Sequence, residues 1–136
     1  MSKQIISTSH APAAVGPYSQ GVRIGDLIYT AGQLGIIPGS KAFAGPDIES
    51  QTRQALENLK AVLEAGGSCL ENVVKTTVFL QDMGEFGRMN AVYAEFFPAA
   101  PPARSAVQVA ALPLGGRVEI EAVAKAGDCE HPDSDD

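Results

Sequence analysis

The stretch Pro101-Pro102-Ala103-Arg104-Ser105-Ala106-Val107-Gln108-Val109 has the pattern of a β-strand that is entered through a rigid turn. Two adjacent prolines fix the backbone and exclude a helix at this point. Beyond them the side chains alternate between two rows, with an arginine at the start of the strand. Arginine keeps its charge at ordinary pH and offers a planar pair of donors that fits a carboxylate or a phosphate. The stretch leaves two interpretations open, an arginine that binds a small anion and a surface arginine at a strand end.

The composition indicates a globular protein with one core. A chain of 136 residues is long enough for a single domain. It has 16 acidic and 10 basic residues, a net charge of −6, and no basic block. Nonspecific binding of nucleic acid depends on neutralising phosphates, so this charge argues against nucleic acid as a partner. Because no apolar run approaches a membrane span and the first residues lack a targeting pattern, we expect a cytoplasmic protein without a membrane partner.

Cysteine and histidine are too scarce to predict a disulfide framework or a metal centre. Cys69 and Cys129 lie far apart in the sequence, so we expect no disulfide. A zinc site needs three or four converging ligands, and only Cys129 and His131 lie close together. The sequence therefore predicts no metal.

Residue periodicity predicts two helices set between strands. The first helix is capped by Asp47, runs for about five turns and ends at Gly66-Gly67. The second starts with a capping box formed by Asp82 and Glu85 and stops at Pro98. Segments 32–45 and 112–116 are expected to be loops, and 127–136 to be disordered. The predicted strands are 3–7, 21–24, 27–31, 73–80, 104–109 and 117–124.

Alternation along the last two strands predicts which side chains face the helices. In 117–124 the wholly apolar row is Val118, Ile120, Ala122 and Ala124, and in the strand before it Val107 should face the same way. The opposite face would then hold Arg104, Gln108, Glu119 and Glu121 beside apolar neighbours. A partly apolar face without a helix to cover it predicts an oligomer.

Six short motifs follow one another over nearly the whole chain: Gly16-Pro17-Tyr18-Ser19-Gln20, Tyr29-Thr30-Ala31-Gly32-Gln33, Val74-Lys75-Thr76-Thr77-Val78, Asn90-Ala91-Val92-Tyr93, Pro102-Ala103-Arg104-Ser105 and Ile120-Glu121-Ala122-Val123-Ala124. Together they resemble the RidA branch of the Rid family, the enamine/imine deaminases. The resemblance implies one RidA-like domain over 3–126, followed by an acidic tail over 127–136.

The resemblance also implies a fold and a reaction. The fold is an α+β, chorismate-mutase-like arrangement with a single mixed β-sheet, two helices packed on one face, and a homotrimer with sites between subunits. The reaction is hydrolysis of reactive 2-imino acids, such as the 2-aminoacrylate/2-iminopropionate pair released by pyridoxal-phosphate dehydratases, to 2-keto acids and ammonia. The family implies no cofactor and no metal, and its partners are small 2-imino and 2-keto carboxylates.

The chemical properties of the matched residues suit this reaction. Arg104 would hold the substrate carboxylate as a bidentate pair and so orient the reacting carbon. Glu121 would activate water and pass on a proton, and the backbone carbonyl of Ala106 would accept from the imine nitrogen. Glu119 is expected to be an ordinary exposed strand glutamate.

Four further residues complete the predicted substrate site. Tyr18 would pack over the flat substrate, or serve only in packing, and the N–H of Gly32 would donate to the carboxylate. Asn90 would line the site or form hydrogen bonds within its own helix. Two residues depart from the family pattern, since many relatives have serine where this chain has Ala31, and bacterial ones have cysteine where it has Ala106. These departures affect rate and substrate range more than reaction class.

Two other functions compete with the deaminase prediction. Some members of the family are named translation inhibitors or endoribonucleases, but the net charge and the lack of histidines outside the tail, except for His10, argue against RNA cleavage. A noncatalytic trimer that binds metabolites or holds unfolded chains would bind carboxylates without turnover, or clients without using Arg104.

Overall fold

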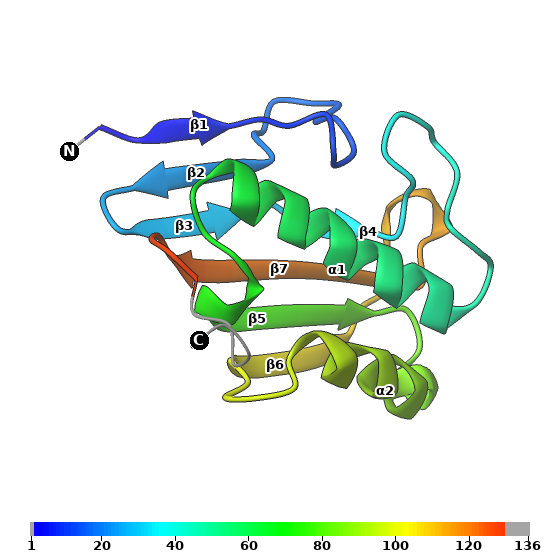
Figure 1. Ribbon diagram of the computed structural model, residues 1–136. Helices are drawn as coiled ribbons and strands as arrows, with labels where there is room; N and C mark the ends of the chain where they lie inside the picture. Colours follow the sequence, from blue (N-terminus) through cyan, green and yellow to red (C-terminus); the bar gives the residue numbers. More distant parts are fainter. Residues whose placement is uncertain (1, 130–136) are drawn as a thin grey trace.

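The computed structural model describes residues 2–129 and shows one mixed sheet with two helices packed on one of its faces (Figure 1). The sheet order is β1-β2-β3-β7-β5-β6, with β4 paired to β7 beside this path. Within residues 2–129, β5 and β6 are the only neighbouring strands that run parallel to each other. The strands are β1 (Gln4–Ile6), β2 (Gly21–Ile24), β3 (Leu27–Thr30), β4 (Gln33–Leu34), β5 (Val73–Leu80), β6 (Ala103–Gln108) and β7 (Val118–Lys125).

The helices are α1 (Ile48–Ala65) and α2 (Phe86–Phe96), with short 3₁₀ turns η1 (Leu70–Asn72), η2 (Met83–Glu85) and η3 (Pro113–Gly115). As predicted, Asp47 caps α1 by accepting the Ser50 N–H at 2.9 Å. Gly67 follows the helix at φ +88°, a conformation that glycine adopts without a steric penalty. No helix within residues 2–129 is long and apolar enough to cross a membrane.

The start of α2 differs from the predicted capping box. The Asp82 carboxylate accepts the N–H of Gly84 within η2, and α2 begins only at Phe86. Glu85 does not reach back to the cap because its carboxylate pairs with Arg117, 2.7 Å away. The predicted loop over 32–45 also contains β4, whose two residues are too few to give a strand periodicity in the sequence.

The core lies between the helices and the sheet. Its fully buried members come from β3, α1, β5, α2 and β7 and include Ile28, Leu59, Val78, Met89 and Ile120. The predicted apolar row of the last strand is confirmed, since Val118, Ile120, Ala122 and Ala124 are at most 4% exposed. Burial of these rows against α1 and α2 provides most of the driving force for folding.

The predicted face assignment of β6 is wrong. Arg104 and Ala106 are in register with Thr76 and Val78 of β5, whose side chains are fully buried under the helices. Val107 instead points to the open face and is 43% exposed. The reason is that α2 contributes aromatic rings and an amide to the helix-covered face, and these groups accommodate the guanidinium of Arg104. Arg104 and Gln108 therefore do not share a face with Glu119 and Glu121.

The open face of the sheet is partly apolar, as predicted. Ile5, Val22, Tyr29 and Val123 form one row across β1, β2, β3 and β7. Ile5 and Tyr29 are 58% and 45% exposed. Val107 is a separate exposed apolar side chain on the same face, at the β6 edge. A contiguous apolar surface of this kind is typical of protein–protein contacts.

Cys69 and Cys129 form a disulfide, which contradicts the prediction from their spacing. After β7 the chain turns back across η1, where Gly127 N–H donates to Gly67 O at 2.9 Å and the Asn72 amide donates to Gly127 O at 3.2 Å. These contacts bring the two Cα atoms to 6.1 Å despite a separation of 60 residues. Disorder therefore does not begin at 127, and the rest of the predicted tail, with His131, lies outside the described residues.

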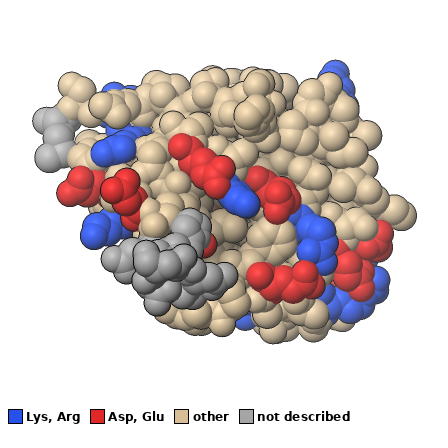
Figure 2. Space-filling view, in the orientation of Figure 1, with Lys and Arg blue, Asp and Glu red and all other residues tan. Residues whose placement is uncertain are grey.

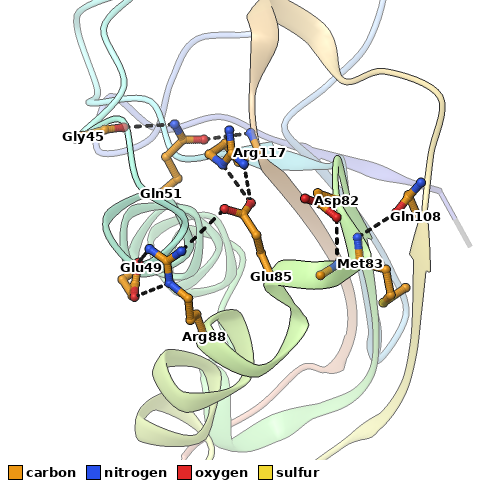
Figure 3. A network of polar contacts seen from close by, with 10 residues as sticks. Gly45, Glu49, Gln51, Asp82, Met83, Glu85, Arg88, Gln108 and Arg117 are labelled. Atoms are coloured by element: carbon orange, nitrogen blue, oxygen red, sulfur yellow. Dashed lines mark hydrogen bonds and ion pairs between the residues drawn. The ribbon is translucent and has the colours of Figure 1, made fainter.

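A polar network joins α1, α2 and the start of β7 (Figure 3). The Arg117 Nε and Nη2 donate to Glu85 Oε1 at 2.8 and 2.7 Å, and Arg88 lies 3.8 Å from the other oxygen of Glu85. Arg88 also forms two 2.8 Å hydrogen bonds with Glu49 of α1. Nearby, Gln51 accepts the Arg117 N–H at 2.9 Å. The side chain of Glu85 is only 13% exposed, so its carboxylate is shielded from water, whereas Arg88 and Glu49 at the edge of the network are exposed.

We expect Glu85→Ala to lower the free energy of unfolding by about 2 kcal/mol, because it leaves the half-buried Arg117 without its carboxylate partner. Urea denaturation of wild type and variant measures this effect. The matched control is Glu95→Ala, which removes the exposed partner of Arg53 and should leave the midpoint nearly unchanged. Equal effects of the two substitutions would contradict this account.

Candidate functional site

Arg104 is held on one face of α2. Its guanidinium carbon lies 4.7 Å from the ring centre of Tyr93 and 5.3 Å from that of Phe86, and Nη1 donates to Asn90 Oδ1 at 2.7 Å. Residues 86, 90 and 93 follow the i, i+4, i+7 spacing of a single helix face. Two aromatic rings and an amide therefore fix the direction of the charge.

Arg104 has no carboxylate partner within residues 2–129. Arg53, Arg88 and Arg117 form ion pairs, and Arg23 donates to two backbone carbonyls. A partly buried arginine without a counter-charge is costly unless an anion binds to it. The site is thus suited to an anionic ligand.

Tyr93 forms a rigid support for this arginine. Its hydroxyl shares a 2.7 Å hydrogen bond with the Thr76 hydroxyl, and its ring stacks at 4.7 Å on Phe97. Burial raises the pKa of Tyr93, so the phenol stays neutral at physiological pH and presents an uncharged ring to Arg104. The sequence placed Tyr93 in the motif that starts at Asn90 but assigned it no role beside Arg104.

The backbone of β6 offers a free acceptor beside Arg104. β6 is the last strand of the sheet, and Val109 N–H donates to Leu80 O of β5 at 2.9 Å. Backbone groups alternate in direction along a strand, so the carbonyl of Ala106 points away from β5 to the unpaired edge. This placement agrees with the acceptor role predicted for that carbonyl, although Ala106 itself is only packed against the core.

A second group of predicted residues lies on the open face of β7. Glu121 is paired with Thr77 of β5, and Ala31 and Gly32 lie just before β4. The carboxyl group of Glu119 rests against Gly32, where a Cβ would lie 2.8 Å from the carboxyl carbon. Burial, and next the charge of Glu121, raise the pKa of Glu119. The prediction that Glu119 is an ordinary exposed glutamate is therefore wrong.

Tyr18 lies apart from both the Arg104 group and the Glu121 group, on the loop before β2, and is 52% exposed. This loop is organised by the buried side chain of Gln20, which accepts the Thr8 N–H at 2.7 Å and donates to Pro12 O at 2.7 Å. This role could not be read from the sequence, because a single glutamine between serine and glycine has no periodicity. Gln20 fixes the base of the loop that presents Tyr18.

The predicted site residues are thus not assembled within one chain. Arg104, Asn90 and Ala106 are together on the helix-covered side of β6. Glu121 is on the open face of β7, and Ala31 and Gly32 lie in the connection from β3 to β4 beside it. The start of β2, next to Tyr18, is four strand spacings from β6, about 19 Å. A cavity of about 420 Å³ near the disulfide is lined by Glu64, Cys69, Phe96 and Cys129, and by none of these predicted residues.

Comparisons with known proteins identify the family. The family model described as Endoribonuclease L-PSP matches residues 8–126. The chain is 50% identical over 125 residues to the 2-iminobutanoate/2-iminopropanoate deaminase of Mus musculus, and the match covers 92% of this chain and 93% of that protein. It is 47% identical over 122 residues to Reactive Intermediate Deaminase A, chloroplastic, of Arabidopsis thaliana, covering 90% of this chain and 65% of that protein.

A solved structure has the same fold. The crystal structure of E. coli TdcF with bound serine is 42% identical and superposes with a TM-score of 0.87, covering 91% of this chain and 99% of that one. The α+β fold with a single mixed sheet and two helices is therefore confirmed. Because a family model matches most of its length and relatives reach 50% identity, the chain is a RidA-like member of the Rid family.

Proposed function

We propose that this protein hydrolyses reactive 2-imino acids, such as the imine tautomer of 2-aminoacrylate, to 2-keto acids and ammonia. The observation that carries the proposal is Arg104, which is aligned by Tyr93, Phe86 and Asn90 and lacks a carboxylate partner within residues 2–129. The names of the mouse and Arabidopsis relatives support the same reaction class. The serine bound to E. coli TdcF supports a small carboxylate ligand.

Arg104 would bind the substrate carboxylate with two parallel N–H donors and so fix the position of C2. The Ala106 carbonyl at the free edge of β6 would accept a hydrogen bond from the imine nitrogen. These two contacts hold the C=N bond in a single orientation, which is the main advantage of a bound over a free reactant. Since this contact uses the backbone, alanine in place of cysteine at this position is compatible with it.

Glu121 would remove a proton from the water that attacks C2. Gly32 next to β4 would donate its N–H to the carboxylate from the other side, and Tyr18 would cover the flat substrate. Asn90 would orient Arg104 through its 2.7 Å hydrogen bond. Alanine at 31 provides no hydroxyl, so we expect any effect of this departure in the substrate range.

The division of these residues between two faces supports a site formed by two copies of the chain. The β6 edge of one copy would supply Arg104 and Ala106, and the open face of its neighbour would supply Gly32 and Glu121. The apolar row on that face, which includes the exposed side chains of Ile5 and Tyr29, would be buried in the same contact. We propose the homotrimer that the family resemblance implies.

RNA cleavage is less well supported, although the family model is described as Endoribonuclease L-PSP. On the helix-covered face, acidic and basic side chains are interspersed instead of forming a basic patch (Figure 2). His10 is the only histidine within residues 2–129 and lies on the surface of the N-terminal loop. The net charge of −6 further opposes phosphate binding.

A coupled assay tests the proposed reaction. A serine or threonine dehydratase generates the imine, and the release of keto acid is followed with and without the purified protein. We expect the protein to accelerate release in proportion to its concentration. A rate equal to the uncatalysed one would contradict the deaminase proposal and favour a noncatalytic metabolite-binding protein, which equilibrium binding of a 2-keto acid would then test.

A further inference from the structure

We propose that Glu119 is the proton donor of the site, and that it works as a pair with Glu121 on the open face of β7. This inference rests on the proposed deaminase function, and it adds a second acid–base group to it. Glu119 and Glu121 lie two positions apart in β7, so their side chains project from the same face of the strand. One carboxyl group would hold a proton while the other is ionised.

The structure provides a specific place for the Glu119 carboxyl group. Gln33 of β4 pairs with Ile120, so Gly32, one residue earlier, lies alongside Glu121. The Glu119 side chain extends toward this glycine, and a Cβ there would be 2.8 Å from its Cδ and 2.9 Å from its Oε2. Because only glycine leaves this space open, the missing side chain at 32 lets the Glu119 carboxyl group approach Glu121.

The residues around Glu119 favour the protonated form of its carboxyl group. The paired residues Leu34 of β4 and Phe79 of β5 are uncharged. On the same face, Lys75 of β5 donates to the Ser105 hydroxyl at 3.0 Å, and Tyr29 of β3 and Lys125 at the end of β7 lie farther along the sheet. Burial and the negative charge of Glu121 raise the pKa of Glu119, which keeps part of its population protonated where an ordinary glutamate is ionised.

Such a pair fits both halves of imine hydrolysis. As the water oxygen bonds to C2, Glu121 takes a proton from the water, the C=N electron pair moves to nitrogen, and Glu119 gives that nitrogen a proton. In the second half the C2–N bond breaks with its electrons on nitrogen, which takes the proton from Glu121 and leaves as ammonia. The hydroxyl proton returns to Glu119 as the keto group forms, so both carboxyl groups regain their starting states.

The pH dependence of kcat/KM tests this role. In wild type we expect activity to fall as pH rises through the pKa of Glu119, because the proton to be donated is lost. Glu119→Gln has the same shape without a transferable proton, so we expect kcat to fall about 100-fold and the alkaline decrease to disappear. Glu57→Gln on the exposed side of α1 is the matched control and should keep the wild-type profile. A Glu119→Gln protein with wild-type kcat and pH profile would overturn the proposal.

A second variant and a direct titration keep the test decisive. Gly32→Ala places a methyl group where the carboxyl group lies, so it should weaken the alkaline decrease while the N–H of residue 32 remains. ¹³C-carboxyl NMR titration of wild type should show that the pKa of Glu119 is raised above the ordinary range of a glutamate carboxyl group. An ordinary titration of Glu119 would overturn the pair even in an active enzyme. An inactive wild type would overturn both the deaminase function and this role, whereas activity with an unaffected Glu119→Gln overturns only this role.

Discussion

Arg104→Ala should lower kcat/KM for imine hydrolysis by about three orders of magnitude. Two charge-assisted hydrogen bonds to a substrate carboxylate are together worth about 4 kcal/mol, which corresponds to about a thousandfold in rate. No other arginine within residues 2–129 can replace it, because each is engaged in an ion pair or in hydrogen bonds to backbone carbonyls. Steady-state kinetics with the dehydratase-coupled assay measure the loss.

Two further variants show whether the loss comes from the geometry of the guanidinium. Arg104→Lys keeps the charge but loses the planar pair of donors, so we expect an intermediate activity. Arg53→Ala removes an exposed arginine of α1 and should have no effect. Wild-type kinetics in a folded Arg104→Ala protein would show that this arginine is not the carboxylate-binding group.

Reducing the Cys69–Cys129 disulfide should lower the free energy of unfolding by up to about 4 kcal/mol. The bond closes a loop of 60 residues, and this value is the chain-entropy estimate for a loop of that length. Denaturation of wild type with and without a dithiol reductant measures the change. Cys129→Ser should match the reduced wild type and should not respond to reductant.

Because of this disulfide, we expect the segment after Ala126 to contribute to the stability of the fold. Truncation after Ala126 removes Cys129 together with the contacts of Gly127, so it should destabilise the fold by an amount similar to that of reduction. Activity of the folded protein should be preserved, because none of the predicted site residues lines the neighbouring cavity. Identical unfolding midpoints for the oxidised and reduced protein would contradict a stabilising role of this bond.

Much of the fold could be predicted because local signals agree with tertiary packing. Asp47 with Ser50 marks the start of α1, and the apolar row of β7 identifies the face that the helices cover. The face of β6 could not be predicted in the same way. Its alternation places the more apolar row, with Val107, on the open face, because the decisive factor is the aromatic and amide surface of α2, which receives Arg104.

The candidate site residues were named from the family resemblance, and the structure shows where each of them lies. Arg104, Asn90 and Ala106 are brought together as the family resemblance implied. The contact between Glu119 and Gly32 could not be predicted, because strand periodicity gives the direction of a side chain and not the space above Gly32. The Cys69–Cys129 bond was missed because a contact between residues 60 apart depends on how β7 ends.

The most direct test of a site formed between two copies is to mix two inactive variants. Arg104→Ala and Glu121→Ala are unfolded together in equal amounts, refolded into mixed oligomers, and assayed for imine hydrolysis. If Arg104 and Glu121 of each site come from neighbouring copies, about one quarter of the sites in a random mixture regain both residues, and activity returns to about that fraction of wild type. Mixed oligomers that form but stay inactive would contradict a site shared between copies.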